Sequence, residues 1–171
     1  MIFQTGDHTV TVKSTLDHPL SKKEAGGLYV YDVSILTLEE PIKISRKALP
    51  VALGTEQEFN TFVKQDAQCQ IVGNGRAGAG GSAVYETYLQ KGQQIYNTNY
   101  DCSIYLKSYD KSGFCFLTAG SDSNSGCPGD SGGPLFCAVD GKYKQFGVAS
   151  FAGVQCNCKL CSTPNSRVIF V

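Results

Sequence analysis

A serine lies within a run of small, flexible residues at positions 127–137, Cys-Pro-Gly-Asp-Ser-Gly-Gly-Pro-Leu-Phe-Cys. The glycines around Ser131 let the backbone turn tightly and let a substrate carbonyl approach without a clash. The backbone N–H groups of Gly129 and Ser131 can then point at one oxygen atom, which is the geometry of an oxyanion hole. The run therefore indicates nucleophilic attack on a carbonyl group. The alternative is a glycine-rich surface turn closed by two cysteines.

This run resembles the nucleophile loop of the chymotrypsin/trypsin family of serine endopeptidases. Residues 31–38, Tyr-Asp-Val-Ser-Ile-Leu-Thr-Leu, resemble the aspartate segment of the same family, and Asp32 lies 99 positions before Ser131. The resemblance implies that Ser131 is the nucleophile, that Gly129 and Ser131 form the oxyanion hole, and that Asp32 orients a histidine. The alternative for Asp32 is a solvated carboxylate at the start of a strand.

Three further stretches are similar to strands of this family. Residues 68–75 resemble its Cys-x-x-x-Gly-Trp-Gly strand, with Asn74 at the tryptophan. Residues 116–120 resemble its Met-x-Cys-Ala-Gly strand, with Thr118 at the cysteine. Residues 150–152, Ser-Phe-Ala, stand where the family has Ser-Trp-Gly, the strand that pairs with the substrate backbone. Both family tryptophans are therefore replaced in this chain.

The resemblance also implies the residues of the primary substrate pocket. Ser125, six positions before Ser131, stands at the base of the pocket, and Ser150, Phe151 and Ala152 stand along its wall. A serine at the base carries no charge, so a substrate Arg or Lys would be buried there without compensation. The methyl group of Ala152 narrows the entrance, where the family usually has glycine. We therefore predict cleavage after uncharged, small to medium apolar residues.

Eight cysteines in 171 residues are typical of an extracellular protein. Sequence alone does not determine their pairing. The resemblance implies three disulfides, namely Cys69–Cys137, Cys102–Cys115 and Cys127–Cys156. Cys158 and Cys161 remain, and they either pair with each other or stay as thiols. A structural zinc site requires four ligands, and Cys156 is already assigned, so we expect no metal and no cofactor.

The catalytic histidine of the family has no counterpart in this chain. The family places it roughly 45 residues before its aspartate, and counting back from Asp32 passes Met1. His8 and His18 lie in stretches that resemble non-catalytic segments, and we expect both to be exposed. The family's cleaved N-terminus, whose ammonium pairs with the aspartate beside the nucleophile, is also missing. We therefore expect Asp130 to lack its partner and the oxyanion loop to be loose.

Two functions fit these observations. The first is a serine endopeptidase, acting on polypeptides or bound by protein inhibitors, whose chain is truncated at the N-terminus and slightly at the C-terminus, so that it is inactive alone. The alternative is a non-catalytic homologue, a binding or decoy protein that keeps Ser131 and Asp32 by descent. The intact Gly-Asp-Ser-Gly-Gly favours the first function. A third possibility is a disulfide-rich adhesion module without enzymatic ancestry.

Short β-prone stretches separated by turns must position these residues, and they lie at 9–12, 29–31, 70–72, 83–85, 146–149 and 168–171. This pattern is typical of antiparallel strands in a barrel or sandwich. Residues 39–60 lack strand alternation and resemble a connector. The family resemblance implies an all-β fold of two antiparallel β-barrels, the first incomplete. We expect a partial first barrel at 1–47, a linker at 48–60 and a second barrel at 61–171, together one incomplete serine protease domain.

Charge and hydropathy exclude several classes of partner. Lys plus Arg and Asp plus Glu both number 15, so the chain has no excess of basic residues for nucleic acid. No apolar run approaches the roughly 18 residues that cross a bilayer, and the first residues lack the features of an export signal. We expect an extracellular protein without nucleic-acid or membrane partners.

Overall fold

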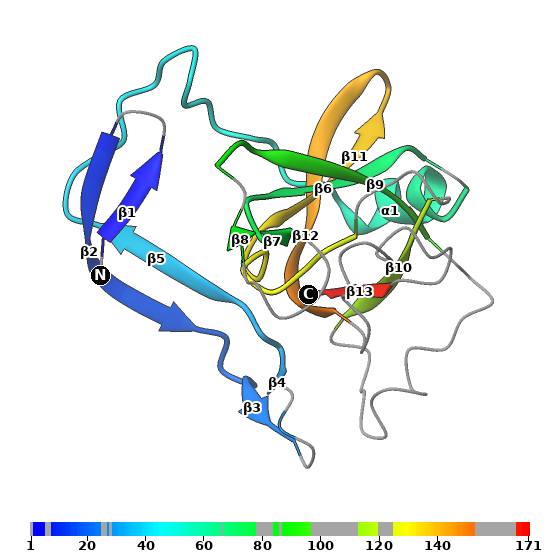
Figure 1. Cartoon of the computed structure of the whole chain (residues 1–171), viewed down its shortest axis with the longest axis horizontal. Coiled ribbons are helices and arrows are strands. Elements are labelled where there is room, and N and C mark those ends of the chain that lie inside the picture. The colour runs from blue at the N-terminus through cyan, green and yellow to red at the C-terminus, as the bar shows by residue number, and fades with distance from the viewer. Residues whose placement is uncertain are drawn as a thin grey trace.

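The computed structural model describes residues 2–5, 8–24, 27, 29–65, 67–77, 84–85, 87–96, 113–119, 125–152 and 167–171. In this part of the chain the strands form an open three-stranded sheet and a closed barrel of six strands (Figure 1). The prediction of an all-β fold with an incomplete first barrel is therefore confirmed.

The open sheet consists of β1 (Ile2–Thr5), β2 (His8–Asp17) and β5 (Ser34–Leu38), all antiparallel. The two-residue strands β3 (Lys22–Lys23) and β4 (Tyr29–Val30) form a small hairpin between β2 and β5. Leu16 and Ile35 lie opposite each other across β2 and β5, and they are 67% and 65% exposed. A closed barrel would bury such a pair, so these exposures are what an incomplete barrel produces.

The closed barrel has the strand order β10-β13-β12-β11-β6-β9, and each neighbouring pair is antiparallel. Its strands are β6 (Cys69–Gly73), β9 (Gln90–Tyr96), β10 (Phe114–Thr118), β11 (Pro134–Val139), β12 (Lys142–Ala152) and β13 (Arg167–Phe170). A separate pair, β7 (Arg76–Ala77) and β8 (Val84–Tyr85), follows β6 along the chain. Closure leaves the barrel without exposed strand edges. The barrel therefore gives a rigid frame for the loop that precedes β11.

Side-chain alternation and turn chemistry explain the β11–β12 hairpin. Leu135, Cys137 and Val139 of β11 are buried, and the residues between them are half-buried, as the two-residue period of a strand requires. Asp140 and Gly141 connect the strands with φ values of 48° and 73°. Positive φ at both positions defines a type I′ turn, for which Asp-Gly is a preferred pair.

A short helix, α1 (Glu56–Thr61), packs against the barrel core just before the single-turn 3₁₀ helix η1 (Val63–Gln65). The ring of Phe59 lies 5.0 Å from that of Phe114 and 5.3 Å from that of Tyr96, measured between centroids. The sequence predicts a connector without strand alternation over residues 39–60 and no helix there, so α1 at its end is a difference. Its signal is the Thr-x-x-Glu pattern of a helix-capping box at Thr55 and Glu58.

The six predicted β-prone stretches overlap β2, β4, β6, β8, β12 and β13. Other strands, including β9 and β11, are not covered by the six predicted stretches. In the described part of the chain, no helix has the length and apolarity needed to cross a membrane.

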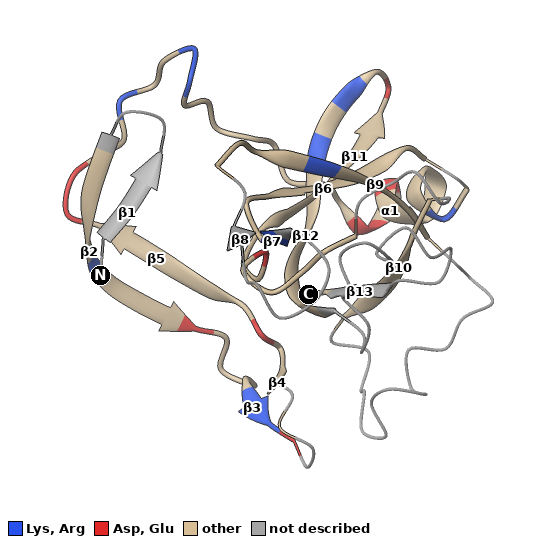
Figure 2. Ribbon diagram, in the orientation of Figure 1, with Lys and Arg blue, Asp and Glu red and all other residues tan. Residues whose placement is uncertain are grey.

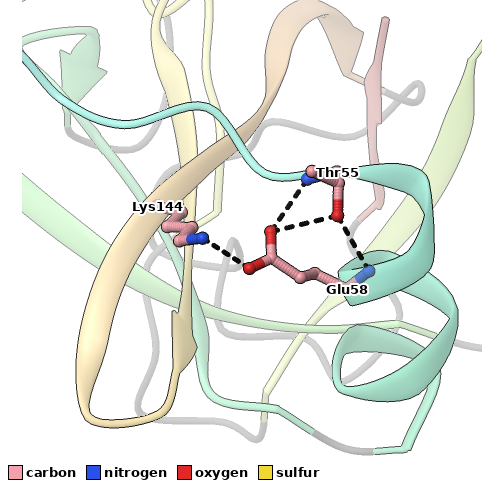
Figure 3. Close-up of polar contacts among 3 residues, drawn as sticks. All are labelled: Thr55, Glu58 and Lys144. Atoms are coloured by element: carbon pink, nitrogen blue, oxygen red, sulfur yellow. Dashed lines mark hydrogen bonds and ion pairs between the residues drawn. The ribbon is translucent and has the colours of Figure 1, made fainter.

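An ion pair connects α1 to the β11–β12 hairpin. The hairpin carries basic residues and α1 carries acidic ones (Figure 2). The ammonium of Lys144 donates to Glu58, whose other carboxylate oxygen accepts from the N–H and hydroxyl of Thr55 (Figure 3). The N–H of Glu58 in turn donates to the Thr55 hydroxyl, which completes the capping box. One carboxylate thus begins the helix and attaches it to the barrel.

Replacing Glu58 with Gln is expected to destabilise the chain at pH 7 but not in acid. The hydrogen bond from Lys144 and then that from Thr55 lower the pKa of Glu58 below its usual 4.5. A lowered folded-state pKa adds stability above pH 4.5, and this stability is lost as the pH falls through the folded value. Urea unfolding should separate wild type from Glu58→Gln at pH 7, and the difference should shrink as the pH falls through the lowered pKa of Glu58. Glu56→Gln, at an exposed position of the same turn, is the control, and an equal effect in both variants would contradict the assignment.

Candidate active site

The residues just before Ser131 form a tight turn. The N–H of Asp130 donates to the carbonyl of Cys127 at 2.9 Å, and Gly129 has a φ of 100°. These are the features of a type II β-turn, which favours proline at its second position and glycine at its third. Pro128 and Gly129 occupy those positions. The local sequence therefore accounts for the turn, which leaves Ser131 exposed at its end.

Hydrogen bonds connect Ser131 to Asp32 through Ser150 of β12. The hydroxyl of Ser131 donates to the backbone carbonyl of Ser150 at 3.4 Å. The hydroxyl of Ser150 donates to Oδ2 of Asp32 at 2.6 Å. Asp32 is half-buried, just before β5, so the open sheet and the barrel meet here. The structure thus brings together three residues that the sequence singles out, and a bonded, half-buried Asp32 disfavours the solvated alternative.

The amides of Gly129 and Ser131 have no acceptor within the described part of the protein. Both residues are exposed, and neither N–H donates a hydrogen bond there. The neighbouring N–H groups of Asp130, Gly132 and Gly133 all donate to backbone carbonyls. The N–H groups of Gly129 and Ser131 flank Asp130 and lie next to the Ser131 hydroxyl. Two such donors can stabilise the oxyanion that forms when a hydroxyl attacks a carbonyl group.

The carboxylate of Asp130 is hydrogen-bonded through both oxygens. Oδ1 accepts from the N–H of Gly75 at 2.8 Å, and Oδ2 accepts from the N–H of Cys127 at 2.9 Å. The sequence leads us to expect that Asp130 lacks an ammonium partner, and in the described structure two backbone N–H groups bond its carboxylate. The expected looseness of the loop stays a prediction. Backbone amides compensate the half-buried charge, because hydrogen bonds to a charged acceptor are stronger than those to a neutral one.

A small cavity lies beside the Ser131 loop. Its volume is about 10 Å³, roughly the minimum that accommodates one water molecule. Its lining comprises Ile71, Gly126, Cys127, Asp130, Ser131, Ala149 and Phe151. Phe151 is thus on the cavity wall, whereas the side chain of Ala152 lies outside the described part.

Ser125, the predicted pocket base, directly precedes the cavity residues Gly126 and Cys127. It is 9% exposed, and within the described structure its hydroxyl has no hydrogen-bond partner. The described side chains therefore provide a buried polar group, without a charge, at this position.

The histidines take no part in this arrangement as far as their side chains are described. His18 stacks on Tyr31, with ring centroids 4.8 Å apart, and its Nδ1 accepts from the N–H of Leu20 at 3.2 Å. It is half-buried rather than exposed as predicted, because the ring of Tyr31 covers one face. The side chain of His8 lies outside the described part.

The disulfide Cys69–Cys137 joins β6 to β11, as the family resemblance implies. Cys115 is also disulfide-bonded, and its expected partner Cys102 lies outside the described residues. Cys127 is buried, and its expected partner Cys156 lies outside them too, as do Cys158 and Cys161. Among the described residues, no cluster of His, Cys, Asp or Glu has the arrangement of a metal site.

Sequence reasoning missed the backbone donors of residues 75 and 76. The N–H of Arg76 donates to the carbonyl of Pro128 at 2.9 Å, beside the Gly75–Asp130 bond. Every residue except proline carries a backbone N–H, so residue types do not reveal which N–H groups will donate to a distant loop. The Pro-Gly pair at 128–129 was the available signal, since it is typical of a type II turn.

Comparisons with known proteins find relatives among chymotrypsin-like proteins. The chain is 34% identical to chymotrypsin-like elastase family member 1 of Macaca fascicularis, over 93% of this chain and 58% of that protein. It is 33% identical to chymotrypsin-C of Rattus norvegicus, over 78% of this chain and 48% of that protein. The chain thus spans about half to three-fifths of the length of these relatives.

A solved structure supports the fold. Neuropsin, a serine protease expressed in the limbic system of mouse brain, superimposes with a TM-score of 0.74 at 21% identity, covering 95% of this chain and 66% of that one. The family model described as Trypsin matches residues 3–168. With this match over almost the whole chain, the chain belongs to the trypsin family of chymotrypsin-like serine peptidases.

Proposed function

We propose that this chain is the larger part of a secreted serine endopeptidase that cleaves polypeptides. The observation that carries the proposal is the Asp32–Ser150–Ser131 hydrogen-bond chain beside two uncommitted amides. The disulfides and the elastase-like relatives support an extracellular location.

In the proposed reaction Ser131 Oγ attacks the scissile carbonyl carbon while a histidine takes its proton. The new oxyanion accepts hydrogen bonds from the amides of Gly129 and Ser131, and the Asp32 carboxylate orients the imidazole and stabilises its charged form. The same imidazole then protonates the leaving amine. Because His18 is engaged elsewhere, the histidine comes from sequence that the longer relatives have and these 171 residues do not span.

Labelling of Ser131 by a fluorophosphonate tests the proposal. A serine hydroxyl is a weak nucleophile without its base, so the 171-residue chain should not label. The chain joined to its upstream coding sequence should label at Ser131, and Ser131→Ala should abolish the signal. Failure of the joined protein to label would contradict a peptidase function.

A second candidate function is that of a non-catalytic homologue that binds protein partners. The contacts of His18 favour it, because its ring stacks on Tyr31 and accepts from the Leu20 N–H and so does not serve Ser131. The upstream sequence separates the two candidates. An Ala-His-Cys with its histidine roughly 45 residues before Asp32 supports the peptidase. A different residue at that histidine supports the binding protein.

The joined enzyme is expected to cleave after Ala, Val or Leu at least about a hundredfold faster, in kcat/KM, than after Arg or Lys. An uncharged Ser125 would leave a buried substrate cation uncompensated. A peptide library measures the profile. Ser125→Asp should shift cleavage towards Arg and Lys, whereas Ser14→Asp, on the exposed surface of β2, should not. A dominant preference for Arg or Lys in the unaltered enzyme would contradict the pocket assignment and point to another carboxylate, such as Asp122, which lies outside the described residues.

A further inference from the structure

Tyr31, directly before Asp32, adopts a strained backbone conformation. Its φ is 51°, in the left-handed region that large side chains rarely adopt. Asp140 is the other residue besides glycine with a positive φ in the described part of the chain, and the Asp-Gly turn at 140–141 explains it. Residues 29–33, Tyr-Val-Tyr-Asp-Val, contain no glycine or asparagine that would favour such a conformation. Contacts with other parts of the structure must therefore hold the strained residue.

The last residue of β2 and the residue after it supply these contacts. The ring of His18 stacks on the ring of Tyr31, with centroids 4.8 Å apart and an angle of 8° between the planes. The N–H of His18 donates to the carbonyl of Val33 at 3.0 Å. The hydroxyl of Ser34 donates to Oδ1 of Asp17 at 2.6 Å. The chain is thus held on both sides of the intervening aspartate.

The backbone turns sharply at Asp32 itself. The N–H of Val33 donates to the carbonyl of Tyr31 at 2.8 Å, which closes a three-residue γ-turn around Asp32. Because Asp32 has no positive φ, this is the inverse form, which is common at strand ends. The direction of the Asp32 side chain therefore depends on the backbone on either side, and its Oδ2 accepts from the hydroxyl of Ser150 at 2.6 Å. A change in the Tyr31 backbone would move the carboxylate relative to Ser150.

A tight turn holds His18 in place. The N–H of Ser21 donates to the carbonyl of His18 at 2.8 Å, and Pro19 occupies the second position of this turn, which proline favours. The N–H of Leu20 donates to Nδ1 of His18 at 3.2 Å, which restricts the rotation of the ring. The fixed His18 ring in turn restricts the ring of Tyr31 by stacking on it.

We propose that His18 and Tyr31 are positioning residues, whose stacked rings hold the strained backbone that directs the Asp32 carboxylate towards Ser150. In this role neither ring exchanges a proton with the substrate, and both act on the reaction through Asp32 alone. Their effect on catalysis rests on the proposed peptidase function, but their effect on the placement of Asp32 does not.

The ¹³C resonance of the Asp32 carboxylate in the 171-residue chain tests the placement. Asp32→Asn assigns the resonance, and Ser150→Ala gives its position without the hydroxyl donor. Tyr31→Asn removes the ring and introduces a residue that tolerates positive φ. The Asp32 resonance in Tyr31→Asn should move most of the way to its position in Ser150→Ala. A resonance that stays at its position in the unaltered chain would overturn the proposal.

Two variants of His18 separate its ring from its hydrogen bond. His18→Phe keeps a ring that can stack on Tyr31, whereas His18→Asn keeps an acceptor for the Leu20 N–H but has no ring. The Asp32 resonance should stay in place in His18→Phe and move in His18→Asn. Equal shifts in the two variants, or shifts in the reverse order, would show that the stacked rings do not place the carboxylate.

Tyr29→Asn is the matched control, because it makes the same change two positions earlier, on β4. Tyr29 is 47% exposed, and its ring lies 5.9 Å from the ammonium of Lys23. The Asp32 resonance should not move in this variant, and a shift equal to that of Tyr31→Asn would contradict the proposal. Amide hydrogen exchange in β6 and β11 should be the same in every variant, which separates a local effect from unfolding of the barrel.

The kinetics of the joined protein test the catalytic consequence. Tyr31→Asn and His18→Asn should each lower kcat by about ten- to a hundredfold and leave KM within about twofold, because a displaced carboxylate affects the chemical step rather than substrate binding. A raised KM with an unaltered kcat would overturn the positioning role. Inactivity of the unaltered joined protein would instead refute the proposed function, and the Asp32 resonance would still decide whether the two rings place the carboxylate.

Discussion

Joining a histidine-bearing upstream segment to this chain is expected to raise its rate of peptide-bond hydrolysis by about six orders of magnitude. The serine, the base and the orienting carboxylate act as a unit, so loss of the base alone costs nearly as much as loss of the whole set. In the proposed function the other parts are Ser131, Asp32 and the amides of Gly129 and Ser131; in the structure, hydrogen bonds to Ser150 join Ser131 and Asp32. What remains in the 171-residue chain is the residual acceleration of oxyanion stabilisation and binding.

The measurement compares kcat/KM for an alanine-containing chromogenic peptide in the 171-residue chain and in the joined protein. The joined protein with Ala at the upstream histidine is the matched control, since it restores the fold but not the base. Activity of that control equal to the unaltered joined protein would contradict the assignment. Stoichiometric labelling of Ser131 in the 171-residue chain would show that another group activates the hydroxyl.

The sequence predicts the site where residue type determines backbone shape. A serine among glycines, and Pro-Gly before it, restrict the loop strongly enough that the turn and its exposed hydroxyl follow from local chemistry. The connection between Ser150 and Asp32 is different. These residues lie 118 positions apart, and only the family resemblance predicts a role for both. Their contact depends on how the open sheet meets the barrel, which no local pattern contains.

The sequence does not predict the backbone N–H groups that bond Asp130. The expectation of an unpartnered Asp130 counted only charged side chains as partners, whereas the structure satisfies it with the N–H groups of Gly75 and Cys127. Glycines at 73 and 75 were visible in the sequence, but their close approach to a carboxylate from a loop 55 positions away was not. The Thr-x-x-Glu pattern of the capping box at Thr55 and Glu58 is visible in the sequence, whereas the lack of strand alternation over residues 39–60 does not by itself distinguish a helix from a loop.

Removing the Cys69–Cys137 disulfide is expected to lower the free energy of unfolding by about 4 kcal/mol. The cross-link closes a loop with a sequence separation of 68, and the chain-entropy estimate for a loop of this length is about 4 kcal/mol. The two cysteines lie opposite each other across β6 and β11 and are 1% and 0% exposed. Apolar replacements are therefore required, because a polar side chain at either position would add its own burial cost.

Two double variants separate the cross-link from packing. Cys69→Ala/Cys137→Ala and Cys69→Ala/Cys137→Val both lack the disulfide, but the second fills more of the space. Urea unfolding should show a large loss in both and a smaller difference between them, whereas a loss below about 1 kcal/mol in either would contradict the estimate. Since β6 ends at Gly73, beside the Asp130 carboxylate, and β11 begins at Pro134, just after the Ser131 loop, the disulfide also limits how far these two ends can separate. Both variants should therefore reduce the hydrogen-exchange protection of the Arg76 amide, which donates to the Pro128 carbonyl. Glu58→Gln, a change at the cap of α1, should leave this protection unaffected.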